Sequence, residues 1–186
     1  MPELSVKGIW FADYAKMVSK LKDLPWERYL TPEDLKVIEG RILPAQWYPL
    51  DLYQRIAIAA FELVGKGKPE MAQLAGRNFL DQLAADEALK PFLNSGDPER
   101  ALQHFTAIHK RLITLGDAHY EKIAARRIRY TITWNKPWKG LFPFVHNFAG
   151  FLIRLVEVNG GKQVKIAFDD QKLDERDRLN YDLQWE

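Results

Sequence analysis

The sequence predicts an α+β fold, helical over its N-terminal two-thirds and followed by a small antiparallel sheet with one helix inserted after its first strand. Apolar residues first recur every three or four positions, and later alternate with polar residues in three separate segments. This change of period marks the passage from helices to strands. We expect a single domain over residues 1–186, mainly helical at 1–120 and with a strand, a helix and a hairpin at 121–186.

Five helices are predicted in the first part. Apolar spacing places the first at residues 9–22. The segment Thr31-Pro32-Glu33-Asp34 combines an N-cap, a proline at the first helical position and two acids at the positive end of the helix dipole, so a short helix runs from there to residue 39. The remaining three helices are expected at residues 50–64, 69–85 and 99–115.

Strict alternation of apolar and polar residues begins at residue 127 and ends at residue 135. An aromatic helix is expected over residues 144–158, ended by Asn159-Gly160-Gly161. Two more alternating runs, around a charged loop at 169–177, predict a hairpin. We expect the first strand to pair antiparallel with this hairpin, and the helices to cover the shared apolar face, made of Tyr130, Ile132, Val164, Ile166, Tyr181 and Leu183.

Composition excludes several kinds of chemistry. The absence of cysteine removes disulfides, iron–sulfur clusters, thiolate zinc sites and cysteine nucleophiles. The formal charge of +2, from 27 basic and 25 acidic residues, gives no reason to expect nucleic acid as a partner. No secretory signal is recognisable at the N-terminus, and charges interrupt the longer apolar stretches, so we expect a cytoplasmic protein without a transmembrane segment.

The four histidines are the first candidates for metal or proton chemistry. His104 and His109 are five residues apart, or about 140° around a helix, so they cannot bind one ion as an i, i+4 pair could. We therefore predict no metal site. His109 follows Phe105 by four residues and precedes Leu112 by three, which turns it toward the apolar stripe. It either faces a pocket or is a hydrogen-bonded histidine at the edge of the core.

Other patterns favour ordinary surface structure. The acidic loop at 169–177 lacks the central glycine and terminal glutamate of a calcium loop. Basic residues gather near Trp134, but Arg127 and Arg129 occupy the polar face of an alternating strand, so nucleic-acid binding is not favoured. No glycine-rich phosphate loop and no serine nucleophile elbow is present. We therefore assign no catalytic residue.

The order of elements resembles that of the heme-nitric oxide/oxygen binding domains and the related four-vinyl reductase domains. The local points of resemblance are Ile108-His109-Lys110-Arg111-Leu112, the helix that contains Gly150, and the ending Asn180-Tyr181-Asp182-Leu183-Gln184-Trp185. In topology the resemblance covers nearly the whole chain. It implies a bacterial member of this superfamily.

The resemblance also implies site residues. It makes His109 the counterpart of the histidine that binds the heme iron, and it places a Tyr-x-Ser-x-Arg motif for the heme propionates on the following strand. Here that strand reads Tyr130-Thr131-Ile132-Thr133-Trp134, so Tyr130 matches while Ile132 and Trp134 replace the serine and the arginine. We expect the indole of Trp134 to pack inward, where it, Phe105 and Phe148 line or fill a pocket.

Three functions follow from these observations. The preferred one is a non-catalytic bacterial sensory or protein-interaction module, with an apolar pocket that is either packed shut or open to a small apolar ligand. The first alternative is a heme-based gas sensor with His109 as proximal ligand and heme as cofactor. The second alternative is an enzyme with an apolar substrate pocket and no recognisable catalytic motif. The expected partner is a small apolar ligand or a protein.

Overall fold

The N-terminal part combines short helices with a two-stranded sheet. The computed structural model describes residues 4–87, 89–114, 116–134 and 139–186. The two short strands pair antiparallel, with Val6 opposite Tyr48. Thr31 and Asp34 form the predicted capping box at the start of the second helix. The elements of this part are β1 (Ser5–Lys7), α1 (Ala12–Lys20), α2 (Pro32–Glu39), β2 (Trp47–Pro49) and α3 (Leu50–Ala59).

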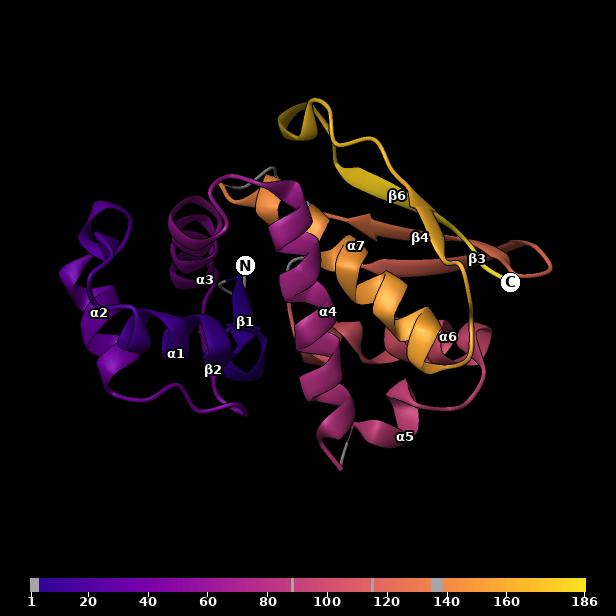
Figure 1. Ribbon diagram of the computed structural model, residues 1–186, viewed down its shortest axis with the longest axis horizontal. Helices are drawn as coiled ribbons and strands as arrows, with labels where there is room; N and C mark the ends of the chain where they lie inside the picture. Colours follow the sequence, from indigo (N-terminus) through magenta and orange to yellow (C-terminus); the bar gives the residue numbers. More distant parts are fainter. Residues whose placement is uncertain (1–3, 88, 115, 135–138) are drawn as a thin grey trace.

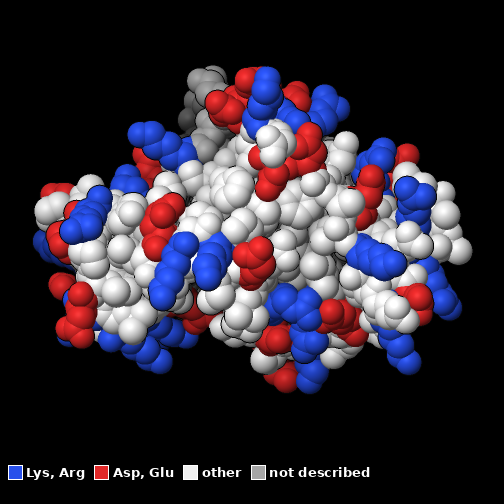
Figure 2. Space-filling model, turned by 45° about the horizontal axis from the view of Figure 1, so that its top comes forward, with Lys and Arg blue, Asp and Glu red and all other residues white. Residues whose placement is uncertain are grey.

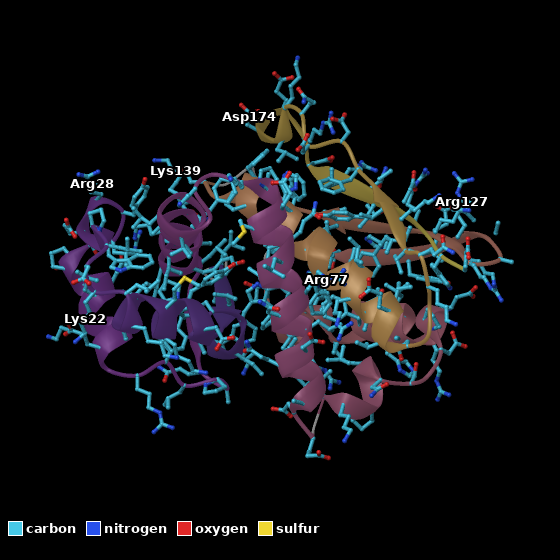
Figure 3. All side chains as sticks on the ribbon, in the orientation of Figure 1. Lys22, Arg28, Arg77, Arg127, Lys139 and Asp174 are labelled. Carbon is cyan, nitrogen blue, oxygen red and sulfur yellow. The ribbon has the colours of Figure 1, made fainter. Side chains whose placement is uncertain are left out.

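The centre of the molecule is a pair of long helices that cross in close contact. In Figure 1, α4 stands between the N-terminal helices and α7, and α7 lies between α4 and the larger sheet. Arg77 on α4, labelled in Figure 3, donates a 2.6 Å hydrogen bond to Glu157 on α7. The helices of this part are α4 (Pro69–Ala85), α5 (Lys90–Leu93), α6 (Pro98–Ile108) and α7 (Leu141–Val158).

Glycines allow α4 and α7 to approach each other. A Cβ atom on Gly76 of α4 would overlap the carbonyl oxygen of Asn147, and a Cβ atom on Gly150 of α7 would overlap that of Gln73. Because each glycine faces the backbone of the other helix, the two main chains touch where side chains normally separate helices. This contact fixes the position of α7, which carries the buried rings of Phe144, Phe148 and Phe151.

The larger sheet has four antiparallel strands in the order β3-β4-β6-β5. The predicted pairing is confirmed, because Tyr130 of β4 lies opposite Tyr181 of β6 and Ile128 lies opposite Leu183. The apolar face is also confirmed: its members on β4 and β6 are buried, and Val164 and Ile166 are half-buried against the core. The strands are β3 (Ala118–Ala124), β4 (Arg127–Thr133), β5 (Lys165–Ala167) and β6 (Arg178–Gln184).

Some boundaries differ from the prediction. The helix expected at 99–115 ends at Ile108 and continues as a 3₁₀ turn at His109–Arg111. The strand β3 was missed, because it is an edge strand with mostly exposed residues and shows no apolar alternation. Strand β3 crosses the boundary expected between residues 120 and 121, where the mainly helical part was predicted to end. The expected ends at Leu115 and Asn135 lie outside the described residues.

Helix α7 is apolar enough to resemble a membrane span by length and composition. It is the one candidate among the described residues, and 67% of its 18-residue window is buried inside the molecule. The sequence analysis did not identify this candidate membrane span, because it took the charged residues within the segment as interruptions of the apolar stretch. The helix packs against α4, α6 and the sheet, so its apolar composition serves the core of the fold.

Candidate functional site

His109 sits at the point where α6 ends, with its imidazole turned into the core. Only 1% of the residue is exposed, and neither ring nitrogen has a hydrogen-bond partner among the described residues. Its ring meets Phe105 and Phe148 edge to face, at centroid distances of 6.0 and 6.3 Å. The sequence left a pocket or a hydrogen-bonded position open for His109, and the structure shows an imidazole that no described residue hydrogen-bonds.

Burial keeps this imidazole neutral. It lowers the pKa of His109 from 6.5 to about 4, and the negative charge of Asp117 only partly offsets the effect. Lys110, which pairs with Asp117, lowers the pKa further. At neutral pH, His109 therefore presents one free nitrogen lone pair inside the protein, which is what a metal ligand or a hydrogen-bond acceptor requires.

Tyr130 lies on β4 and is completely buried. Its hydroxyl group makes no hydrogen bond of normal geometry with any described residue, and burial raises its pKa. Although the hydroxyl of Thr106 is near enough to oppose this shift, it donates its own hydrogen to Leu102. The Tyr130 ring is 6.4 Å from Phe105 and 5.8 Å from Phe148. Tyr130 and His109 therefore contact the same two phenylalanine rings.

Aromatic side chains join α6 directly to α7. Phe105 of α6 is 4.6 Å from Phe151 and 5.9 Å from Phe148, measured between ring centroids. Trp10 extends the cluster toward the N-terminal part, 6.3 Å from Phe151. All of these rings are buried, and Figure 3 shows side chains throughout the region between the helices and the sheet. We call Phe105, His109, Tyr130, Phe148 and Phe151 the aromatic cluster.

Ile132 and Trp134, the two residues that differ from the heme-binding motif, are both buried in the core. Ile132 is 1% exposed and Trp134 is 2% exposed, which confirms that the indole packs inward. The Trp134 Nε1 donates a 2.7 Å hydrogen bond to the carbonyl oxygen of Arg176. These side chains carry no positive charge, so they cannot bind a carboxylate as the missing arginine would.

The remaining charged candidates serve structure. Arg129 forms a bidentate pair with Asp182 across the sheet, and Arg176 pairs with Asp169 in the acidic loop. Asp174 lies at the projecting tip of that loop (Figure 3). Among the described residues, no three His, Asp or Glu side chains gather as a metal site. Figure 2 shows basic and acidic side chains interspersed over the face in view, without a continuous basic surface.

Two cavities on the other side of α7 were missed by the sequence analysis. One has a volume of about 150 Å³ and the other about 180 Å³. Tyr14 and Met17 line both, together with Ala75 and Asn78 of α4, and no aromatic-cluster residue lines either. The apolar spacing at residues 9–22 did predict the helix that carries Tyr14 and Met17. It could not show that a space remains beside them.

Solved structures resemble the whole chain. No family model and no curated protein matches the sequence. The crystal structure of the Fe(II) unliganded H-NOX protein from K. algicida superimposes with a TM-score of 0.69 at 13% identity, covering 97% of this chain and 96% of that one. An oxygen-binding H-NOX domain related to soluble guanylate cyclases, in its oxygen complex, gives a TM-score of 0.64 at 15% identity, covering 97% and 95%.

The chain has the H-NOX fold. A third structure, from a study of heme distortion in the H-NOX family, gives a TM-score of 0.67 at 15% identity, covering 97% of this chain and 95% of that one. H-NOX is the short name of the heme-nitric oxide/oxygen binding domains, so the resemblance seen in the sequence is confirmed at the level of the fold. At these identities the comparison establishes architecture, and the site must be argued from this chain's own residues.

Proposed function

We propose that this chain is a sensory domain that binds heme, with His109 as the ligand of the iron. The single observation that carries the proposal is the buried, neutral imidazole of His109, whose two nitrogens lack a partner among the described residues. The similar structures add support, because they include an Fe(II) H-NOX protein, an oxygen-bound H-NOX domain and a protein from a study of heme distortion. The sequence analysis preferred a module without heme, and the comparisons give the heme-based alternative more support.

The residues of this chain would contribute in distinct ways. His109 would hold the iron through one ring nitrogen, and it needs no deprotonation at neutral pH because its pKa is about 4. The rings of Phe105 and Phe148 would keep water away from the bound group. Tyr130 would offer its unpaired hydroxyl as a hydrogen-bond donor. Heme would supply an iron centre that binds a small gas molecule.

A domain without heme is the second candidate, and a specific observation favours it. Phe105 touches both Phe148 and Phe151, so α6 and α7 are already in contact beside His109. Ile132 and Trp134 also leave the propionates without a cationic partner at the positions of the motif. Heme binding therefore requires the aromatic cluster to open, which costs packing energy. In this second candidate, the cluster is simply the core of a sensory or protein-interaction module.

The absorption spectrum of the protein, expressed with adequate heme, tests the two candidates. We expect a strong Soret band that is lost in His109→Ala and kept in His104→Ala, a histidine five residues earlier on the same helix. A colourless protein that does not bind added hemin would overturn the heme proposal and leave the second candidate. A Soret band that survives in His109→Ala would show that another residue holds the iron.

The biological setting belongs to the same proposal. We expect a bacterial, cytoplasmic protein whose ligand state is read by a protein partner. The fold supports a sensory role, and the mixed charges on the face in Figure 2 give no support to nucleic acid. Isolation of the protein with and without its ligand, followed by crosslinking to cytoplasmic proteins, would test whether a partner distinguishes the two states.

A further inference from the structure

Two neighbouring cavities lie where the N-terminal helices meet α4. They are neighbours because they share four lining residues, Tyr14, Met17, Ala75 and Asn78. The first, of about 150 Å³, extends toward the end of α3. The second, of about 180 Å³, extends toward Trp10, Phe79 and Asn147. Neither cavity is lined by His109 or by another residue of the aromatic cluster, although Trp10 and Phe79 in the wall of the second contact Phe151.

Their size and walls define a class of ligand. The walls of the first cavity are mostly alanine, valine, leucine, methionine and phenylalanine side chains. An apolar cavity of about 150 Å³ holds one benzene-sized molecule, whereas pockets for drug-sized ligands occupy roughly 300–1,000 Å³. A molecule with one ring and a short substituent would therefore fill one cavity and reach the other.

A hydrogen-bond donor lies at the wall shared by the cavities. The hydroxyl oxygen of Tyr14 accepts a 3.2 Å hydrogen bond from the side-chain amide of Asn147. The same hydroxyl lies close enough to Tyr53 to raise the pKa of that buried tyrosine further. Burial, and to a smaller extent the charge of Asp13, raises the pKa of Tyr14 to about 12, so the hydroxyl stays protonated. The indole of Trp10 is already engaged, because it donates to the Tyr53 hydroxyl at 3.1 Å.

The first cavity also borders an irregular helix. Residues Ala60–Val64 form a π-helical turn after α3, and Ala60, Phe61 and Val64 from this turn line the cavity. A π-helical turn is rare and is frequently found at functional sites. Near it, Met71 and Leu74 of α4 are 41% and 47% exposed, which leaves apolar side chains at the opening.

We propose that these cavities bind a small, mainly apolar molecule with one hydrogen-bond acceptor, such as an aromatic ketone, and that Tyr14 donates the hydrogen bond. The apolar walls supply most of the affinity, and the Tyr14 hydroxyl selects ligands with an acceptor. The site does not depend on heme, so it is tested in the His109→Ala protein as well as in the unchanged chain.

Methionine methyl groups report binding directly. Met17 lines both cavities and Met71 lines the first, and the chain has three methionines in all. We expect acetophenone to shift the ¹³C-methyl NMR signals of Met17 and Met71, in a saturable way, below about 10 mM, a concentration typical of weak fragment-sized ligands. Ethylbenzene, which has nearly the same shape but no acceptor, should bind more weakly. Absence of a shift with both probes would overturn the proposal.

Two variants with matched controls test the residues. Tyr14→Phe should weaken acetophenone binding about 3- to 10-fold, the usual effect of one hydrogen bond, and leave ethylbenzene unchanged. Tyr29→Phe, a half-buried tyrosine outside both cavities, should change neither. Ala75→Leu should abolish binding of both probes by filling the shared wall, whereas Ala85→Leu, at the exposed end of the same helix, should not. Equal binding to the Ala75→Leu and Ala85→Leu proteins would refute the site.

Discussion

The side chain of Trp134, which follows β4, donates a hydrogen bond to the carbonyl oxygen of Arg176, which precedes β6. The indole Nε1 lies 2.7 Å from the Arg176 carbonyl oxygen. The backbone nitrogen of Trp134 also donates a hydrogen bond, to the carbonyl oxygen of Asp177 at 2.7 Å. Both bonds join the end of β4 to the residues that lead into β6. Trp134 therefore stabilises the sheet at the position where the heme-binding pattern has an arginine.

Replacement of this side chain should lower stability strongly. Trp134→Ala removes a large ring that is 2% exposed, so the free energy of unfolding should fall by about 3–5 kcal/mol, the usual range for a buried aromatic. Trp134→Phe keeps most of the packing and should lose less. Trp47, which is 40% exposed, provides the control, and Trp47→Ala should cost less than about 1 kcal/mol. Urea unfolding measures all three, and an unchanged midpoint for Trp134→Ala would contradict the packing argument.

The crossing of α4 and α7 should not tolerate a methyl group. In Gly76→Ala, the new Cβ would overlap the carbonyl oxygen of Asn147, so the helices must separate or the chain must unfold. We expect a loss of at least about 2–3 kcal/mol, the upper range for overpacking. Gly40→Ala is the control, because the atoms nearest to its Cβ are 3.4 and 3.5 Å away. Thermal unfolding compares the two variants, and similar melting temperatures would show that the crossing adapts.

Asp34 joins α2 to α3 in a way that also predicts a stability effect. Its carboxylate accepts hydrogen bonds from the backbone of Thr31 and from two nitrogens of Arg55, at 2.6 and 2.7 Å. Asp34→Asn keeps the shape but removes the charge, so it should cost about 1–3 kcal/mol. Glu33→Gln, on the exposed side of the same first turn, should have little effect. Urea midpoints that fall equally in both variants would indicate a general charge effect on α2.

The sequence predicted those helices and strands whose apolar residues recur with a regular period. Alternation along β4 and β6 was enough to pair Tyr130 with the C-terminal hairpin, because only one register buries every apolar side chain. It missed β3, where apolar alternation is absent, and it carried the helix of His109 past its end at Ile108. A helix end depends on what its last turn packs against, and that information lies in distant segments of the chain.

The candidate site was predicted only in part. The stripe that contains Phe105 indicated that His109 points inward, and the structure agrees. Whether the ring finds a hydrogen-bond partner or remains unpaired depends on α7 and β4, so spacing within one helix could not decide it. The cavities beside Tyr14 could not be predicted either. A space between two helices leaves no periodic pattern in the sequence of either helix.

The last prediction concerns the acid sensitivity that His109 confers. In the unfolded chain its pKa is 6.5, whereas burial lowers it to about 4 in the folded protein. Between these values the unfolded state binds more protons, so stability falls as the pH decreases from 6.5 toward 4. His109 alone should reduce the free energy of unfolding by about 2 kcal/mol between pH 7 and pH 5. His109→Leu should remove this part of the pH dependence, while His119→Leu, at an exposed position, should leave it in place. Urea unfolding of the heme-free proteins at the two pH values gives the comparison, and equal pH dependence in the unchanged protein and His109→Leu would mean that the imidazole is charged or hydrated in the folded state.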